Sequence, residues 1–219
     1  MPEAIITGLL SSALICGAGE SSPETAENLE FLRNSKKVYF VAMHEELDAE
    51  STSCEVVYTG VGKARATRAI LRYIRENRDV MESENPPLIV SIGTAGSGKH
   101  HKGDILLCER FFNNGDSFIK ESIEFNTFPE STPFICASSD FFVSEYNFKA
   151  EEVSKMREAF DCLDMEAFAL ANICKELGLK FCAVKCISDG ADGTVSDFDA
   201  ELPAFRKKLN AFVKMIDKK

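Results

Sequence analysis

The stretch Leu88-Ile89-Val90-Ser91-Ile92 constrains the fold more than any other, because all of its residues except Ser91 are apolar. A strand that is apolar on both faces is typical of a parallel sheet covered by helices on both sides. Further short apolar runs at residues 37–43, 55–58 and 181–187 alternate with stretches of helical period. The chain is therefore predicted to be an α/β protein, a three-layer αβα arrangement around a mixed, mostly parallel central sheet.

The remaining elements are predicted from end signals and periodicity. Ser22 and Pro23 are typical of a helix start, and this helix would run to about residue 34. Another helix begins at Leu163, with apolar residues at the helical period, and Gly178 closes it. Residues 113–116, Asn-Asn-Gly-Asp, are typical of a turn, which indicates that part of the sheet is antiparallel. The other predicted helices are residues 63–78 and 203–217, and the other strands are residues 104–108 and 134–137.

Composition excludes several classes of protein. The formal net charge is −10, whereas a nucleic-acid binder needs a basic face for the phosphate backbone. The apolar stretch at residues 4–16 is too short to span a bilayer, and it is preceded by Glu3 with no Lys or Arg, which argues against a signal peptide. The chain has no internal repeat or low-complexity linker. We therefore expect a cytoplasmic protein that binds neither nucleic acid nor membrane, built as a single domain over residues 1–219.

The eight cysteines include no Cys-x-x-Cys pair, and most of them lie in apolar runs. This pattern is typical of small buried side chains in a reducing compartment. His100 and His101 are adjacent, and no spacing of His and Cys is typical of a zinc site. We expect no metal and no cofactor.

Polar or glycine-containing segments follow five of the predicted strands. Taken alone, each has an ordinary explanation, such as a tight turn, a solvated acidic pair, two core phenylalanines or a helix cap. The loops that follow parallel strands meet at one edge of a sheet, however, and that edge is where α/β proteins bind ligands. Their common placement therefore predicts a ligand site. The segments are residues 44–46, 59–62, 93–96, 138–142 and 188–189.

Two acidic residues in these surroundings indicate a reaction. Glu166 lies at a predicted helix start and Asp189 lies just past the next buried strand, so both can face one crevice. A carboxylate can accept hydrogen bonds from the vicinal hydroxyls of a sugar. A second carboxylic acid can donate a proton to a leaving base. Glu166 and Asp189 together are therefore suited to the cleavage of a nucleoside.

The motifs resemble those of the purine nucleosidase/nucleoside phosphorylase superfamily, and within it the 5′-methylthioadenosine/S-adenosylhomocysteine nucleosidases. The resemblance covers roughly residue 38 to the C-terminus. Its most specific part is Asp164-Met165-Glu166-Ala167 followed, after one strand, by Ile187-Ser188-Asp189. Supporting matches are residues 42–46, 91–97, 102–105 and 137–143. Residues 1–36 are an atypical N-terminal segment by this comparison, and the segment between Glu46 and Thr59 is shorter than in the family.

The resemblance implies a nucleoside phosphorylase-like fold, a homodimer and hydrolysis of a 5′-substituted adenine nucleoside with release of adenine. Asp189 would protonate the purine, and Glu46 would orient and deprotonate the attacking water. Cleavage of an N-glycosidic bond builds a cationic sugar and negative charge on the base, which these groups would meet. The substrate-binding residues implied are Glu166 and Met165 at the ribose, Thr94 and Gly96 beside the sugar, Phe142 and Val143 at the base, Ser188 next to Asp189, and Met43, Val61 and Phe198 around the 5′ substituent.

Two alternatives remain open. A purine nucleoside phosphorylase would need arginines or a nest around its anion, and Arg65 and Arg68 follow the loop at residues 59–62. On a helix these arginines can face solvent, and Glu46 would repel phosphate, which favours water. The other alternative is a catalytically silent nucleoside-binding protein of the same fold. The presence of both Glu166 and Asp189 argues against it.

Overall fold

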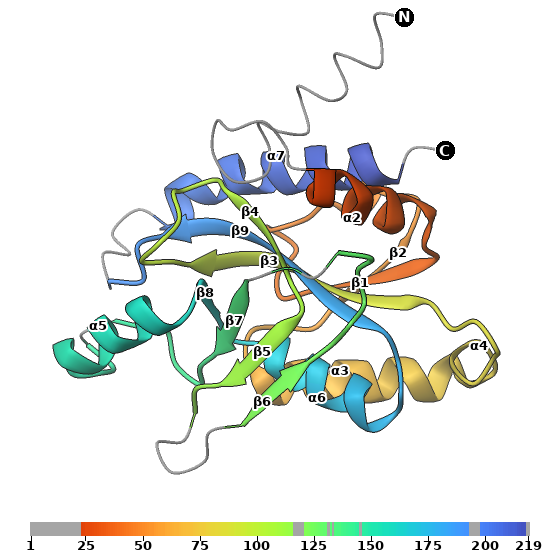
Figure 1. The fold of residues 1–219 in the computed structure, drawn as a ribbon, viewed down its shortest axis with the longest axis horizontal. Helices are drawn as coiled ribbons and strands as arrows, with labels where there is room; N and C mark the ends of the chain where they lie inside the picture. The colour runs from red at the N-terminus through yellow and green to blue at the C-terminus, as the bar shows by residue number, and fades with distance from the viewer. Residues whose placement is uncertain are drawn as a thin grey trace, which may run out of the picture.

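The computed structural model describes residues 23–115, 121–130, 132, 134–144, 146–192 and 198–217. In this part of the chain one sheet separates two layers of helices (Figure 1). The strands are β1 (Lys37–Val41), β2 (Glu55–Tyr58), β3 (Leu88–Gly96), β4 (Ile105–Cys108), β5 (Arg110–Asn113), β6 (Ser122–Glu124), β7 (Ile135–Ser138), β8 (Cys162–Asp164) and β9 (Phe181–Asp189). The helices are α2 (Pro23–Asn34), α3 (Lys63–Glu76), α4 (Arg78–Met81), α5 (Ala150–Ala159), α6 (Ala167–Glu176) and α7 (Phe198–Ile216), with a 3-10 helix, η1 (Ala49–Ser51).

The sheet is mixed and mostly parallel, which confirms the predicted fold class. Its order is β2-β1-β3-β8-β7-β5-β6, and β9 lies between β3 and β4. The β1–β2, β1–β3, β3–β9, β5–β7 and β7–β8 pairs are parallel. The β3–β8, β4–β9 and β5–β6 pairs are antiparallel. The antiparallel β5–β6 pair lies where the sequence indicated a turn.

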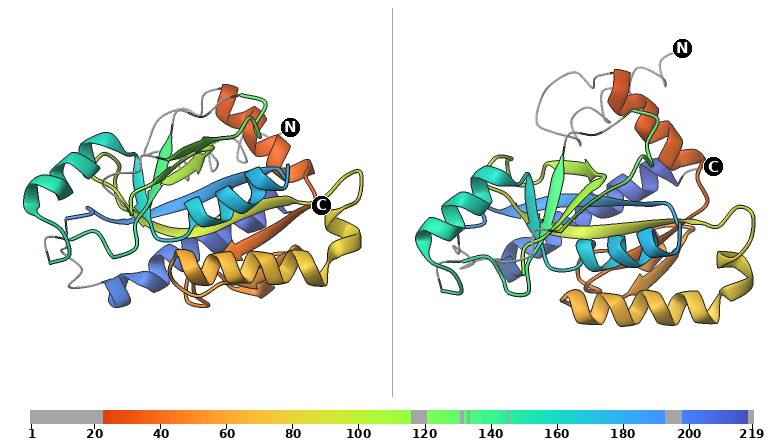
Figure 2. Two further views of the ribbon diagram at one scale, coloured as in Figure 1. Left: turned by 90° about the horizontal axis from the view of Figure 1, so that it is seen from below. Right: turned by 60° about the horizontal axis from the view of Figure 1, so that its bottom comes forward.

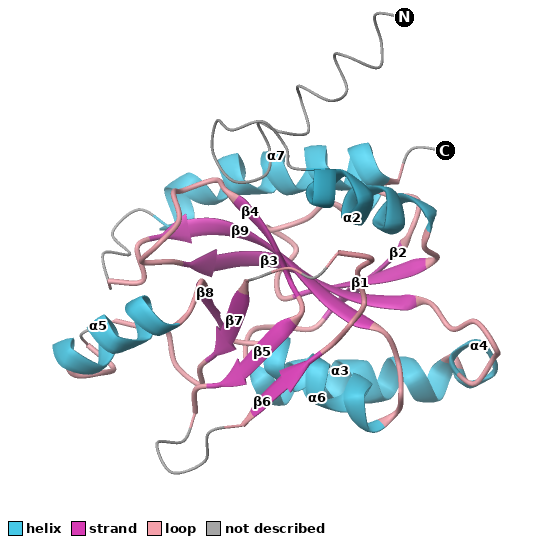
Figure 3. Cartoon of the chain, viewed as in Figure 1, coloured by secondary structure: helices cyan, strands magenta, loops and turns pink. Residues whose placement is uncertain are grey.

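Side-chain alternation along the strands builds two cores, one on each face of the sheet. In β1, Val38 and Phe40 point to the core under α3 and α6, whereas Tyr39 and Val41 point to the core under α2 and α7. Figure 1 shows α2 and α7 on one side of the sheet and α3 and α6 on the other. Figure 2 shows the same elements in two further views, and Figure 3 shows the layers by element type. A strand buried on both faces is mostly apolar, which explains why residues 88–92 are apolar except for Ser91.

Several predicted boundaries were wrong. Leu163 and Asp164 are not in a helix but in the short strand β8, which pairs with β7 and meets β3 at Gly96. Leu163 fitted the helical period because burial in a sheet also selects an apolar residue. The terminal helix begins at Phe198, five residues before the predicted start. The first strand ends at Val41, two residues before the predicted end.

Two segments predicted as loops are strand ends. Residues 93–96 belong to β3 and residues 188–189 belong to β9, because these two neighbours continue to pair beyond the apolar runs. The register shifts between Ala95 and Gly96, and Gly96 then pairs with Asp189. The sequence showed no clear signal for β5, β6, β8, α4 or α5.

The first 22 residues of the predicted atypical segment, which include Cys16, lie outside the described residues. The other seven cysteines are free, and all but Cys54 are buried. Leu29 and Leu32 of α2 are buried in the core under α7, so this helix is part of one helix layer. Among the helices described, none is long and apolar enough to cross a membrane.

Candidate active site

A cavity of about 330 Å³ opens at the C-terminal ends of β1, β2, β3, β7, β8 and β9. All twelve residues predicted for the site line it, although their segments are far apart in the sequence. They are Met43, Glu46, Val61, Thr94, Gly96, Phe142, Val143, Met165, Glu166, Ser188, Asp189 and Phe198. Six further residues complete the lining: Ala42, Ala95, Phe141, Leu163, Asp164 and Ala191.

Glu46 is buried and held at both carboxylate oxygens. Its Oε1 accepts hydrogen bonds from the Thr94 amide at 2.7 Å and from Thr94 Oγ1 at 2.6 Å. Its Oε2 accepts from the Met43 amide at 3.2 Å. A Cβ at Gly93 would lie 3.0 Å from Oε1, so glycine at this position leaves room for the carboxylate. The short segment after Glu46 thus leaves this side chain in the cavity.

Asp189 is also held at both oxygens. Ser188 Oγ lies 2.8 Å from Oδ2, and the Ala191 amide donates to Oδ1 at 2.8 Å. A Cβ at Gly96 would lie 2.6 Å from Oδ1, so only glycine permits this approach of the carboxylate to β3. Ala191 has φ 50, a backbone conformation that costs energy for a residue with a side chain, and such outliers cluster at functional sites.

The Ser188 hydroxyl can serve either protonation state of Asp189. It lies within hydrogen-bonding distance of two acceptors, Asp189 Oδ2 and the Ala95 carbonyl oxygen at 3.2 Å. When Asp189 is ionised, the hydroxyl can donate to it. When Oδ2 carries a proton, the hydroxyl can donate to Ala95 and accept from Asp189. The carboxyl can therefore gain and lose a proton without moving its neighbour.

Glu166 is the residue just before α6, and its side chain faces the loop before α3. Its Oε1 accepts a hydrogen bond from the Gly62 amide at 2.7 Å. Burial and the nearby Asp164 carboxylate raise the pKa of Glu166 to about 7, although Lys185 and the Gly62 amide act to lower it. With Oε1 engaged by Gly62, Oε2 is the oxygen best placed to receive a ligand hydroxyl.

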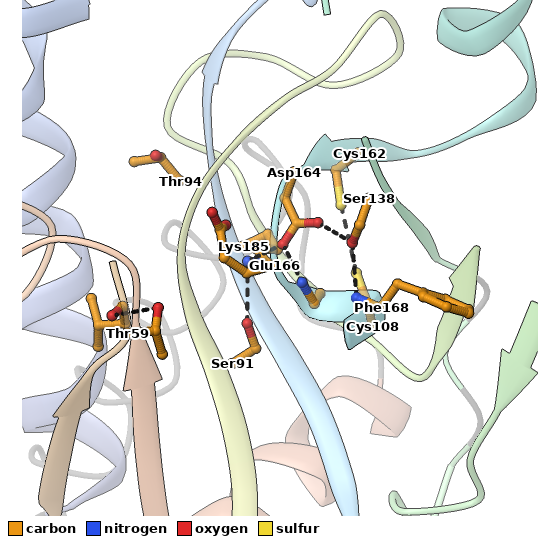
Figure 4. Close-up of polar contacts among 12 residues, drawn as sticks. Thr59, Ser91, Thr94, Cys108, Ser138, Cys162, Asp164, Glu166, Phe168 and Lys185 are labelled. Carbon is orange, nitrogen blue, oxygen red and sulfur yellow. Dashed lines mark hydrogen bonds and ion pairs between the residues drawn. The ribbon is translucent and has the colours of Figure 1, made fainter. Parts of the chain in front are cut away.

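A buried ion pair lies behind Glu166, and sequence reasoning assigned it no role. Lys185 Nζ lies 2.7 Å from Asp164 Oδ2 and 3.3 Å from Ser91 Oγ (Figure 4). Burial acts to lower the pKa of Lys185, but the neighbouring groups Asp164, Cys136 and Glu166 together outweigh burial, so the pKa is raised. The signal available in the sequence was a single lysine inside an apolar strand, because a charge in such a place needs a partner.

Asp164 also fixes the start of α6. Its Oδ2 accepts from the Ala167 amide at 3.0 Å, and Ser138 Oγ donates to its Oδ1. Ser138 Oγ in turn accepts from the Phe168 amide at 2.8 Å. These bonds satisfy amides at the helix start that have no partner within the helix. Because Glu166 is the residue just before α6, the network holds its backbone in place.

The rest of the cavity is mainly apolar. Phe141, Phe142, Met43, Val61 and Phe198 all contribute apolar side chains to its lining. An aromatic side chain can stack on a planar base, and apolar side chains accept a substituent without hydrogen-bonding needs. The arrangement combines three carboxyl groups, from Glu46, Glu166 and Asp189, with apolar walls.

The anion-binding groups expected of a phosphorylase are not found in this cavity lining. Arg65 and Arg68 are exposed on α3, and neither lines the cavity. Within the described part of the chain, no three side chains of His, Cys, Asp and Glu are grouped as a metal ion would require.

Comparison with known proteins agrees with this fold. Residues 132–216 match the family described as Phosphorylase superfamily. Over 89 residues the chain is 34% identical to a 5′-methylthioadenosine/S-adenosylhomocysteine nucleosidase of Haemophilus influenzae (strain PittEE). That match covers 38% of this chain and spans only 37% of the length of the curated relative.

Solved structures share the fold over more of the chain. A mutant 5′-methylthioadenosine/S-adenosylhomocysteine nucleosidase of Helicobacter pylori, with 5′-methylthioadenosine in its active site, superimposes with a TM-score of 0.66 at 20% identity. The alignment covers 84% of this chain and 98% of that one. Futalosine hydrolase of Helicobacter pylori strain 26695 gives a TM-score of 0.62 at 20% identity, covering 83% and 97% of the two chains. The expected resemblance is confirmed.

Proposed function

We propose that this chain, which has the nucleoside phosphorylase-like fold, is a purine nucleosidase that hydrolyses the N-glycosidic bond of a 5′-substituted adenine nucleoside. The observation that carries the proposal is the meeting of Glu46, Glu166 and Asp189 in one cavity with apolar walls. A reaction that makes a cationic sugar and an anionic base needs an acid at the base, negative charge near the sugar and a positioned nucleophile.

Each carboxyl group has a separate task in this mechanism. Asp189, in its acid form, donates a proton to the purine ring, and Ser188 accommodates the change in charge. Glu166 accepts hydrogen bonds from the ribose hydroxyls through Oε2. Glu46, held by Thr94, accepts a proton from the water that attacks the anomeric carbon.

Phe142 and the Val143 backbone bind the base, and Met165 packs on the sugar.

Water is favoured over phosphate as the nucleophile. A phosphate dianion close to Glu46 would be repelled, and Arg65 and Arg68, which are exposed on α3, do not line the cavity to offset that repulsion. The phosphorylase alternative is therefore the weaker one. A silent binding protein is also disfavoured, because three separately held carboxyl groups suit turnover better than binding.

The 5′ substituent would be surrounded by apolar side chains of the cavity lining. Met43, Val61 and Phe198 are apolar and suit a methylthio group, the substituent of 5′-methylthioadenosine. The matched nucleosidases support this choice, whereas futalosine hydrolase shows that the same fold also serves a different substrate. The homodimer and the cytoplasmic location remain predictions.

One set of incubations tests the proposal. The protein is mixed with 5′-methylthioadenosine, S-adenosylhomocysteine, adenosine, inosine or futalosine, each with and without phosphate, and base and sugar products are separated by chromatography. We expect adenine and a free reducing sugar at the same rate in both buffers, fastest with 5′-methylthioadenosine. A sugar 1-phosphate formed only with phosphate would indicate the phosphorylase. Saturable binding without base release would indicate the silent protein.

A further inference from the structure

Lys63, the first residue of α3, joins three chain segments at the mouth of the cavity. Its Nζ lies 2.8 Å from Asn113 Oδ1, at the end of β5, and 3.1 Å from Asp140 Oδ1, in the loop after β7. The Lys63 side chain is 16% exposed and that of Asp140 is 50% exposed. Lys63 does not line the cavity, so it acts through the segments that it joins.

Two of the three segments that Lys63 joins carry a part of the site. The amide of Gly62, one residue earlier, donates to Glu166. The loop at residues 139–144 contains Asp140 and supplies the three base-side residues Phe141, Phe142 and Val143. A contact that joins the start of α3 to this loop therefore sets the distance between the ribose end and the base end of the cavity.

The packing around Lys63 leaves little freedom for its partners. A Cβ at Gly115 would collide with the Asp140 carboxylate and lie 2.5 Å from Lys63 Nζ. The backbone at Gly115, just after β5, is therefore in close contact with the Lys63–Asp140 ion pair. Asn114 Nδ2 donates to Ser139 Oγ at 2.8 Å in the same place. The loop is held at its other end by Asn147 Nδ2, which donates to the Phe142 carbonyl oxygen at 2.9 Å.

We propose that Lys63 is a positioning residue that fixes the base-side loop, residues 139–144, against the start of α3 and the turn after β5. The loop is then already ordered before the base binds. Binding therefore does not carry the cost in conformational entropy of ordering the loop. The effect on turnover depends on the function proposed above, whereas the effect on the loop does not.

The proposal is tested with Lys63→Met, which keeps the aliphatic stem and removes the charge, and with Lys63→Arg, which restores a donor. Hydrogen–deuterium exchange followed by mass spectrometry measures the loop directly. We expect faster exchange of the amides in residues 139–144 in Lys63→Met, near-normal exchange in Lys63→Arg, and no change in β9 in either variant. Unchanged exchange of the loop in Lys63→Met would overturn the proposal, whatever the protein catalyses.

Kinetics give the second readout. Loss of the charge-assisted contacts of Lys63 with Asn113 and Asp140 is expected to raise KM about tenfold in Lys63→Met while kcat changes much less. Asp140→Asn should raise KM as well. The double variant should add little, because both changes remove the same contact between Lys63 and Asp140. Lys155→Met is the matched control, since Lys155 forms an exposed pair with Glu151 on α5, away from the cavity lining. Equal KM values in Lys63→Met and the control, with an active wild type, would contradict the positioning role and leave the proposed function intact.

Discussion

The ammonium group of Lys185 lies 2.7 Å from the Asp164 carboxylate, and their side chains are 3% and 1% exposed. Lys185 comes from β9 and Asp164 from β8, two strands that both border β3. The pair therefore fixes the place of β8, and with it the start of α6 and Glu166. A charge buried this deeply is stable only while its partner is present.

Lys185→Met should destabilise the fold, because Asp164 is left buried and without its counter-charge. Removal of one partner of a buried pair typically costs about 3–5 kcal/mol. Urea unfolding followed by circular dichroism measures the free energy of unfolding. The double variant Lys185→Met with Asp164→Asn should recover part of the loss. If Lys185→Met were as stable as the surface variant Lys155→Met, the pair would have no structural role.

Asp189→Asn should fold normally and lose turnover by about 10²–10⁴-fold, since an amide cannot donate an acidic proton to the base. Its amide can still accept the bond from Ala191, which argues for an intact site. Base release is followed with 5′-methylthioadenosine, and binding of adenine is measured by calorimetry. Near-wild-type turnover in a folded variant would show that another group is the acid.

Gly96→Ala should impair the reaction more than the fold. The added Cβ would lie 2.6 Å from Asp189 Oδ1 and 3.0 Å from the Ala191 Cβ, so the carboxylate must move away from its partners. A small misplacement of a reacting group can cost about 10²-fold in rate. Melting temperature and kcat are measured together. A variant with normal kcat would indicate that the position of Asp189 is less critical than the contacts suggest.

Glu166→Ala should reduce cleavage of adenosine far more than cleavage of 2′-deoxyadenosine, which already lacks one hydroxyl. The reason is that Glu166 Oε2 is expected to bind the ribose diol while Oε1 binds the Gly62 amide. Rates with the two substrates are compared in wild type and variant. Losses of equal size on both would argue against contact with the 2′-hydroxyl.

The raised pKa of Glu166 predicts how stability depends on pH. The folded protein keeps a proton on this group up to about pH 7, whereas the unfolded chain releases it near the ordinary glutamate value. Between the ordinary glutamate pKa and about pH 7, the folded state therefore binds more protons than the unfolded chain. The stability that comes from the proton on Glu166 is lost as pH rises through this range towards 7.

Wild type should therefore lose stability relative to Glu166→Gln between pH 5 and pH 8. Glutamine can still accept from Gly62 but does not titrate. Urea unfolding of both proteins at the two pH values gives the difference in the free energy of unfolding. Parallel behaviour of the two proteins would mean that Glu166 titrates as an ordinary carboxyl group.

The sequence by itself determined the layers of the fold and the edge of the sheet that carries the site. Residues 88–92 are apolar except for Ser91 because both faces of β3 are covered, and that property is local to the strand. Glu46, Glu166 and Asp189 could be placed at one edge because each follows or ends a predicted strand or begins a helix. Strand direction then brings them together without further information.

Tertiary structure decided the contacts that depend on register between distant segments. The strand β8 could not be predicted from Leu163. This residue is apolar because it is buried, and burial selects an apolar residue in a helix and in a strand alike. The ends of β3 and β9 extend to Gly96 and Asp189 only because these strands pair with each other.

The same applies to the contacts that hold the site. Lys185 with Asp164, Gly96 with Asp189, and Lys63 with Asp140 each join residues that are far apart in the sequence. Local pattern reports whether a residue is buried and which way its strand runs. It does not report which side chain lies opposite, because that depends on how the whole sheet is assembled and twisted.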